Sequence, residues 1–331
     1  MRGGPPKTAV AVVAATLLAG CGADVLNEEL DVSGSWSLVL ADADPAALLN
    51  LDEDLSGSYE QVILRAGGTA ETYPVELART KGGWYEVTRR WSDGSGVEQS
   101  LTGVGAAFGE GLFAVAEPGE GCPLYIFTVG SGALGGRLFL TGDTEGVPVT
   151  FTGEGSASPE APQILPLGSS LSLNALGVDG TGAPYLARYD LVPRGGSILV
   201  SQHIAPGAPG EETLFGTGVR VGEHLVLNTA GFLTVFRQRG EDWFGMWVDL
   251  KAGALASEIL TPDDAKLDVM PFFVGNDFEL EKADDGFFIA CWVEDGEIYE
   301  AAALVFGEKY LALSIPDPAE PWLGVFTVGE G

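Results

Sequence analysis

The chain has 331 residues, with 47 acidic side chains against 17 Lys and Arg residues and a formal net charge of −30 at pH 7. A surface this negative repels phosphate backbones, so the composition excludes nucleic acid as a partner. Hydrophobic residues make up 46% of the chain, which is enough for a large core, and the 48 dispersed glycines indicate many tight turns.

The first 20 residues have the layout of a secretory signal peptide. Arg2 and Lys7 provide positive charge, and the stretch TAVAVVAATLLA, from Thr8 to Ala19, is uncharged. This stretch is shorter than the ~20 residues that a membrane-spanning helix needs, but it suits the apolar region of a signal. We therefore expect residues 1–20 to direct export and then to be removed.

The leader ends in LAGC at positions 18–21, which resembles the lipobox of bacterial lipoproteins. The resemblance implies cleavage before Cys21 and lipid attached to the Cys21 sulfur, a nucleophile suited to accepting a diacylglyceryl group. Two or three acyl chains anchor a protein stably. Residues 21–32 then form a lipidated tether. Because Gly22 rather than Asp follows the cysteine, the resemblance favours the outer membrane of the cell envelope in a bacterium with two membranes.

Beyond the tether, the chain consists of short alternating runs rich in β-branched and aromatic residues. Turns of Gly, Asp and Pro separate these runs at hairpin distances, a pattern typical of antiparallel strands. We expect about twenty strands and almost no helix. Examples of the strand-like runs are Trp84–Trp91, Leu124–Val129, Ser197–Ile204, Phe232–Gln238 and Phe287–Val293.

The strand-like runs recur in a repeating order. Segments 103–128, 218–236 and 302–327 each read as a strand, a Gly-Glu turn, a strand, a loop and an aromatic strand. The sequences LGGRL at 134–138 and WFGMW at 243–247 hold similar positions in the first two copies. Self-similarity of this kind indicates a repeat architecture.

We therefore expect an all-β fold of three tandem antiparallel meander units, at 33–155, 167–260 and 272–331. The third copy is short, and the N-terminal segment Gly34–Leu40 resembles the strand that it lacks. A chain-end strand that completed this unit would remove two exposed sheet edges. Closed eight-stranded barrels and propeller blades both fit the strand spacing, so the sequence leaves that choice open.

Two short motifs near the start of the first unit could belong to ligand sites. Gly34-Ser35-Trp36 is similar to the Gly-x-Trp opening of lipocalins, which are ligand-carrying barrels, although Gly-x-Trp at a first strand is more often simple packing. Residues 52–57 (DEDLSG) offer oxygens at alternate positions, as calcium loops do. Ile63 stands where an EF-hand loop needs a glutamate, so we interpret this segment as a solvated acidic loop.

Signals for catalysis or metal binding are weak. His203 and His224 are the only histidines, and they are not spaced as metal ligands. Cys122 and Cys291 remain after lipidation, and their spacing does not decide between a disulfide and two free thiols. Carboxylate pairs could serve glycoside hydrolysis, but so acidic a chain brings acids together by chance. The pairs are Glu211-Glu212, Glu241-Asp242 and Asp263-Asp264. We predict no catalytic residue, no cofactor and no metal site.

These observations favour a non-enzymatic binding or structural scaffold, attached to the membrane through lipid on Cys21 and presenting loops to a glycan or protein. A lipocalin-like carrier of a small molecule is the second interpretation, and a carbohydrate-active enzyme is the third. Tryptophans could contact a ligand, but in a β protein of this size we expect most of them in the core or at barrel ends. They include Trp243, Trp247, Trp292 and Trp322.

Overall fold

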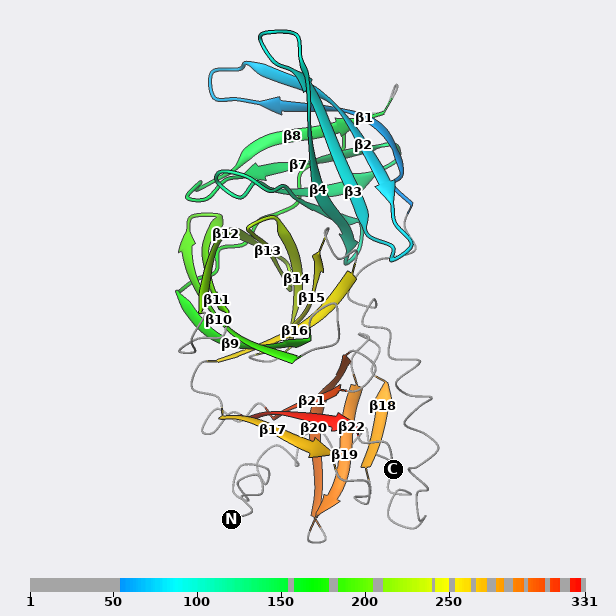
Figure 1. Ribbon diagram of the computed structural model, residues 1–331, viewed down its shortest axis with the longest axis vertical. Coiled ribbons are helices and arrows are strands. Elements are labelled where there is room, and N and C mark those ends of the chain that lie inside the picture. Colours follow the sequence, from blue (N-terminus) through cyan, green and yellow to red (C-terminus); the bar gives the residue numbers. More distant parts are fainter. Residues whose placement is uncertain are drawn as a thin grey trace. The chain divides into compact units, whose positions relative to one another are not determined.

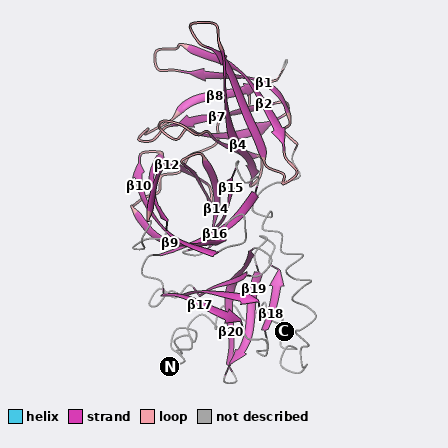
Figure 2. Cartoon of the chain, viewed as in Figure 1, coloured by secondary structure: helices cyan, strands magenta, loops and turns pink. Residues whose placement is uncertain are grey.

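The structure is a computed structural model, and Figure 1 shows its described strands labelled along the chain. It describes residues 54–153, 158–178, 184–204, 211–239, 242–249, 254–262, 266–272, 278–282, 288–294, 297–306, 310–315 and 322–328. This part of the chain contains strands and loops and no helix, as Figure 2 shows, so the all-β prediction is confirmed. Within these residues, no helix is long and apolar enough to cross a membrane.

The first eight strands form a closed antiparallel barrel, in which each strand pairs with the next and β8 pairs back with β1. This connectivity excludes propeller blades for this unit. The strands are β1 (Gly57–Leu64), β2 (Ala70–Arg79), β3 (Tyr85–Ser92), β4 (Glu98–Phe108), β5 (Leu112–Ala116), β6 (Leu124–Gly130), β7 (Ala133–Phe139) and β8 (Val147–Thr152).

The next eight strands close into a second barrel with the same order, as the ring of β9 to β16 in Figure 1 shows. They are β9 (Leu171–Val178), β10 (Pro184–Arg194), β11 (Ser197–Ile204), β12 (Glu212–Val221), β13 (His224–Thr229), β14 (Phe232–Arg239), β15 (Asp242–Asp249) and β16 (Ala254–Pro262). The expected meander units are therefore closed barrels in these two cases.

The last six strands form one sheet in the order β17-β22-β21-β20-β19-β18, with β17 parallel to β22 and the other neighbours antiparallel. They are β17 (Lys266–Phe272), β18 (Phe278–Lys282), β19 (Phe288–Glu294), β20 (Glu297–Phe306), β21 (Tyr310–Ile315) and β22 (Trp322–Val328). The segment Gly34–Leu40, expected to complete this unit, lies outside the described residues.

Two glycines at matching positions show that the two barrels are built alike. A Cβ at Gly136 in β7 would lie 2.7 Å from Cδ1 of Phe127, and one at Gly245 in β15 would lie 2.2 Å from Cδ1 of Phe236. In both barrels an aromatic ring on the preceding strand therefore covers the glycine, and only a residue without a Cβ fits there. These glycines are the central residues of the LGGRL and WFGMW segments.

Several strands are buried on both faces because each barrel covers part of the other. All residues of β13 are buried, as are Val104–Phe108 of β4 and Phe113–Ala116 of β5. One set of alternate side chains fills the parent barrel, and the other set packs where β13 and β14 meet β4 and β5. The Phe108 and His224 rings, for example, meet edge to face with centroids 5.2 Å apart.

A buried amide joins the two barrels. The side chain of Asn228 in β13 is fully buried, and its Nδ2 donates hydrogen bonds to the backbone oxygens of Glu117 (2.9 Å) and Pro123 (2.7 Å). Its Oδ1 accepts a bond from the backbone N–H of Gly231 at 2.9 Å. Every polar atom of this side chain therefore has a partner, which is what burial of an amide requires.

Candidate ligand cavity

Aromatic side chains fill the interior of the first barrel. The rings of Tyr125 and Phe127 stack with centroids 6.1 Å apart, and Phe127 lies 4.6 Å from Phe151. Tyr85 and Phe113 meet edge to face at 5.4 Å. All five rings are buried in one cluster with aliphatic residues from the surrounding strands. An eight-stranded barrel has an interior just wide enough for side chains to fill, and here they do so.

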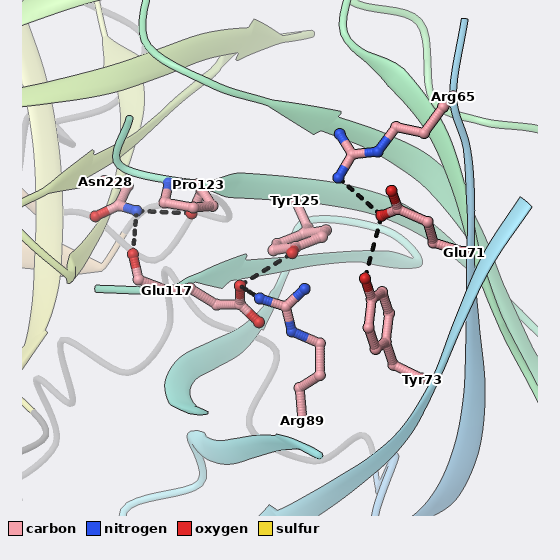
Figure 3. Close-up of polar contacts among 8 residues, drawn as sticks. All are labelled: Arg65, Glu71, Tyr73, Arg89, Glu117, Pro123, Tyr125 and Asn228. Carbon is pink, nitrogen blue, oxygen red and sulfur yellow. Dashed lines mark hydrogen bonds and ion pairs between the residues drawn. The ribbon is translucent and has the colours of Figure 1, made fainter. Parts of the chain in front are cut away.

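A charged cluster completes the filling of the first barrel (Figure 3). The Glu117 carboxylate is 2% exposed and accepts bonds from the Arg89 guanidinium (2.8 Å) and the Tyr125 hydroxyl (3.0 Å). The same guanidinium lies 5.1 Å from the ring centre of Tyr73 and 5.6 Å from that of Trp91. Burial raises the pKa of Glu117, while Arg89 and then Tyr125 act to lower it. The buried negative charge thus has both a counter-charge and a donor.

The second barrel, by contrast, contains a cavity of about 270 Å³. This volume is close to the lower end of the roughly 300–1,000 Å³ found for ligand pockets. Its described lining is mostly aromatic and aliphatic, with a few neutral polar groups and no charged side chain. These residues are Tyr185, Tyr189, Gln202, Ile204, Leu214, Phe232, Thr234 and Trp247.

The cavity exists because two large side chains of the first barrel have smaller counterparts in the second. Arg89 lies opposite Leu101 in the β3–β4 ladder, and Gln202 lies opposite Leu214 in the β11–β12 ladder. In each case the leucine precedes an inward glycine by two residues, so the two positions correspond. Gln202 is shorter than Arg89 and carries no charge, and it therefore leaves interior space.

The second replacement is found by comparing Phe127 and Phe236, the two phenylalanines that cover the matching glycines of the barrels. Tyr125 precedes Phe127 by two residues, and Thr234 precedes Phe236 by two residues. Because side chains alternate along a strand, Tyr125 and Thr234 face the interior at equivalent depths. The phenol ring of Tyr125 in the first barrel thus corresponds to the small hydroxyl-bearing side chain of Thr234 in the second. Thr234 lines the cavity.

The two tyrosines of the cavity wall are held by hydrogen bonds. The hydroxyl of Tyr185 accepts a bond from Nε1 of Trp247 at 2.8 Å. The hydroxyl of Tyr189 donates to Oε2 of Glu258 at 2.9 Å. The rings of Tyr185 and Trp247 meet edge to face with centroids 6.5 Å apart, and Phe232 meets Trp247 in the same way at 5.8 Å. The aromatic wall is therefore pre-organised by its own contacts.

A buried carboxyl lies behind this wall. Glu258 is 0% exposed, and it faces the interior because Leu260, two residues further along β16, belongs to the barrel core. Its Oε1 has no hydrogen-bond partner among the described residues. Burial raises the pKa of Glu258 to about 7, and the hydroxyls of Tyr189 and Tyr185 act in the opposite direction. Unlike Glu117, this carboxyl has no guanidinium beside it in the described structure.

The two histidines are not brought together as a metal site. His203 lies on the outer face of β11, with Nε2 3.4 Å from Asp190 and Nδ1 3.5 Å from Glu211. His224 is buried, and burial lowers its pKa. Within the described residues, no group of three or more His, Cys, Asp or Glu side chains is placed to hold a metal ion.

The tryptophans divide between core and cavity. Trp243 is 2% exposed and belongs to the core of the second barrel, with the Arg220 guanidinium 5.7 Å from its ring centre. Trp247, four residues along the same strand, lines the cavity. The expectation that most would be core residues fits Trp243, whereas the side chains of Trp292 and Trp322 lie outside the described part.

The other residues singled out from the sequence do not converge on the cavity. Cys122 is a free thiol whose Sγ lies 3.2 Å from the Phe215 carbonyl oxygen. Asp54 is exposed, with Oδ1 accepting a bond from the backbone N–H of Ser56 at 3.0 Å. Glu211 and Glu212 are exposed, and Asp242 is buried in β15. The following lie outside the described residues or have undescribed side chains: Cys21, Gly34-Ser35-Trp36, Asp52, Glu53, Glu241, Asp263-Asp264 and Cys291.

Sequence reasoning missed Tyr189, Gln202 and Glu258. Glu258 is one of 47 acidic residues, and its residue type alone does not show that it is buried. Its position in the strand does give a signal. Glu258 alternates with Leu260 on the inward face of a strand, where an apolar residue is the rule. Comparison of the chain with known protein families and with curated proteins found no match.

Proposed function

We propose that the protein is an exported, lipid-anchored carrier whose second barrel holds a small, largely apolar molecule. The observation that carries this proposal is the cavity of about 270 Å³, walled by Tyr185, Tyr189, Phe232 and Trp247. Concave sites lined by aromatic side chains with a few convergent polar groups are the usual form of a small-molecule site. Of the interpretations drawn from the sequence, this favours the carrier over the loop-presenting scaffold.

The filled first barrel supports the same proposal by contrast. Both barrels have eight strands and the same order, so strand number alone does not leave a cavity. The space depends on the side chains at two interior positions, Gln202 and Thr234, where the first barrel has Arg89 and Tyr125. In this proposal the first barrel is a rigid platform and the second is the binding module.

In this proposal, lipid attached to Cys21 determines where the protein is located. Lipid on the cysteine sulfur would hold the carrier at the cell envelope, with residues 21–32 as the lipidated tether between membrane and barrels. The substitution Cys21→Ser removes the acceptor thiol, so the protein should move from the detergent phase to the aqueous phase on phase separation. Intact mass provides the second measurement. A Cys21→Ser protein found wholly in the detergent phase would contradict the anchor.

The carrier role is tested by mass spectrometry of the protein purified from its natural host under native conditions. The expected result is one small molecule per chain, which is released on denaturation. Leu214→Trp should abolish retention because the indole would occupy the cavity. The matched control is Phe215→Trp on the same strand, because the Phe215 side chain is 65% exposed and points outward. Equal retention by both variants, or by neither, would overturn the cavity as the binding site.

A further inference from the structure

The chemistry around the cavity restricts the kind of molecule that it can hold. Its described lining carries no charge, while one carboxyl, Glu258, is fully buried directly behind Tyr189. A buried carboxylate without a positive partner is costly, whereas one that gains a counter-charge is stabilised. The described residues that influence Glu258 include no cation, and a ligand could provide one.

The aromatic wall favours the same type of group. Trp and Tyr rings attract cations through the negative faces of their π-systems, and cages of such rings are used to bind ammonium ligands. Tyr185, Tyr189 and Trp247 all line this cavity. The hydroxyl of Tyr189 is committed as a donor to Glu258, so the lone pairs left on its oxygen can only accept a bond. A ligand N–H group is the complementary partner.

We propose that the ligand of the second barrel is a small organic amine, bound as its ammonium ion against the aromatic wall, with Glu258 as the buried counter-charge. This inference rests on the carrier function proposed above and names its ligand class. The negative net charge of −30 would in addition attract cations toward the protein.

The proposal links binding to the protonation of Glu258. The titratable groups that face this carboxyl are the hydroxyls of Tyr189 and Tyr185, and the pKa of Tyr189 is raised well above its usual range by burial. Tyr189 therefore keeps its proton near pH 7. The Arg220 guanidinium, near the other end of β12 from the cavity residue Leu214, lies 5.7 Å from the ring centre of Trp243. An incoming ammonium should make Glu258 release its proton.

Calorimetry with a matched pair of probes tests the inference. Phenethylamine and 2-phenylethanol have nearly the same shape, but only the first is an ammonium ion at pH 7. The natural protein should bind phenethylamine about tenfold or more tightly than the alcohol, as expected for a charge that is paired out of water. In Glu258→Gln this ratio should fall to about one, while binding of the alcohol should persist and show that the variant is folded.

Proton release on ligand binding is a second measurement. A purely structural role of Glu258 would not produce it. Because burial raises the pKa of Glu258 to about 7, titrations in buffers of different ionisation enthalpy should show net proton release when phenethylamine binds at pH 7. Glu258→Gln should release none. The matched control is Glu212→Gln, which removes an exposed acid from the same barrel and should behave as the natural protein does.

The outcomes separate this inference from the carrier function. Equal affinity for amine and alcohol, or a preference that survives in Glu258→Gln, would overturn the amine inference and leave the carrier function intact. Binding of neither probe by the natural protein would also overturn the amine inference. In that case the molecule retained in native mass spectrometry decides the carrier function independently.

Discussion

The two barrels have the same strand order and the same covered glycines, yet one is solid and the other is hollow. In the first barrel, stacked rings and the Arg89–Glu117 ion pair occupy the interior. In the second, Gln202 and Thr234 stand at the corresponding positions and a cavity remains. The backbone thus sets the maximum interior space, while a few inward side chains decide whether that space is used for stability or for binding.

The buried acids make the same contrast in electrostatic terms. Glu117 accepts bonds from a guanidinium and a phenol, so its negative charge is compensated within the protein. Glu258 has tyrosine hydroxyls but no described cation, and one of its oxygens has no partner among the described residues. The first arrangement stabilises a fold by itself, whereas the second leaves a buried group whose energy depends on pH and on what occupies the cavity.

The largest effect should come from breaking the ion pair of the first barrel. Arg89→Ala leaves the Glu117 carboxylate buried without its counter-charge, and the free energy of unfolding should fall by about 3 kcal/mol. Urea unfolding at pH 7 measures this change. The neighbouring Arg90→Ala is the control, because its pair with Glu76 is about half exposed on both sides and should contribute less than about 1 kcal/mol. Equal losses in the two variants would show that Arg89 does not compensate a buried charge.

A comparable effect, dependent on pH, is expected from Glu258→Gln. The pKa of Glu258 is raised from 4.5 to about 7 by burial, so the folded protein binds the proton more tightly than the unfolded chain does. Its contribution to stability is present below pH 4.5 and is lost as the pH rises through 7, by roughly 3 kcal/mol in all.

Glu258→Gln should therefore gain stability relative to the natural protein as the pH is raised. Urea unfolding of both proteins at pH 5 and pH 8, without added ligand, measures the difference directly. The expected advantage of the variant grows between the two values by up to roughly 3 kcal/mol. An advantage that is the same at both pH values would mean that Glu258 does not titrate as a buried, uncompensated acid.

A smaller effect is expected at the contact between the barrels. Asn228→Ala removes the two hydrogen bonds to the Glu117 and Pro123 carbonyl oxygens, and it should lower the free energy of unfolding by about 2 kcal/mol. Asn228→Asp keeps the acceptor for the Gly231 N–H but cannot donate, so it should be at least as destabilising as Asn228→Ala. If Asn228→Asp is as stable as the natural protein, the amide does not hold the barrels in the described way.

The all-β architecture could be predicted because alternation of apolar and polar residues and regular turn residues are local signals. The equivalence of LGGRL and WFGMW was also visible, since the glycine at the centre of each is required by a ring on the neighbouring strand. The choice between barrel and propeller could not be made, because it depends on the pairing of β1 with β8, which are far apart in sequence.

The site could be predicted only in part. Trp247 was a candidate ligand contact and does line the cavity, but the same reasoning applied to Trp243, which is a core residue. Both are inward residues of one strand, and they differ only in depth. Depth depends on which side chains from other strands reach that level, such as Thr234 in place of a tyrosine, and this information is distributed over the whole barrel.

The central claim is that the second barrel has room for a ligand and the first does not. A titration with the neutral fluorophore N-phenyl-1-naphthylamine tests it most directly, using the natural protein, Thr234→Tyr and Tyr125→Phe. We expect one site in the natural protein, its loss in Thr234→Tyr, where the ring fills the cavity, and its retention in Tyr125→Phe, where the filled barrel is changed by one hydroxyl. Undiminished binding by Thr234→Tyr would contradict the claim.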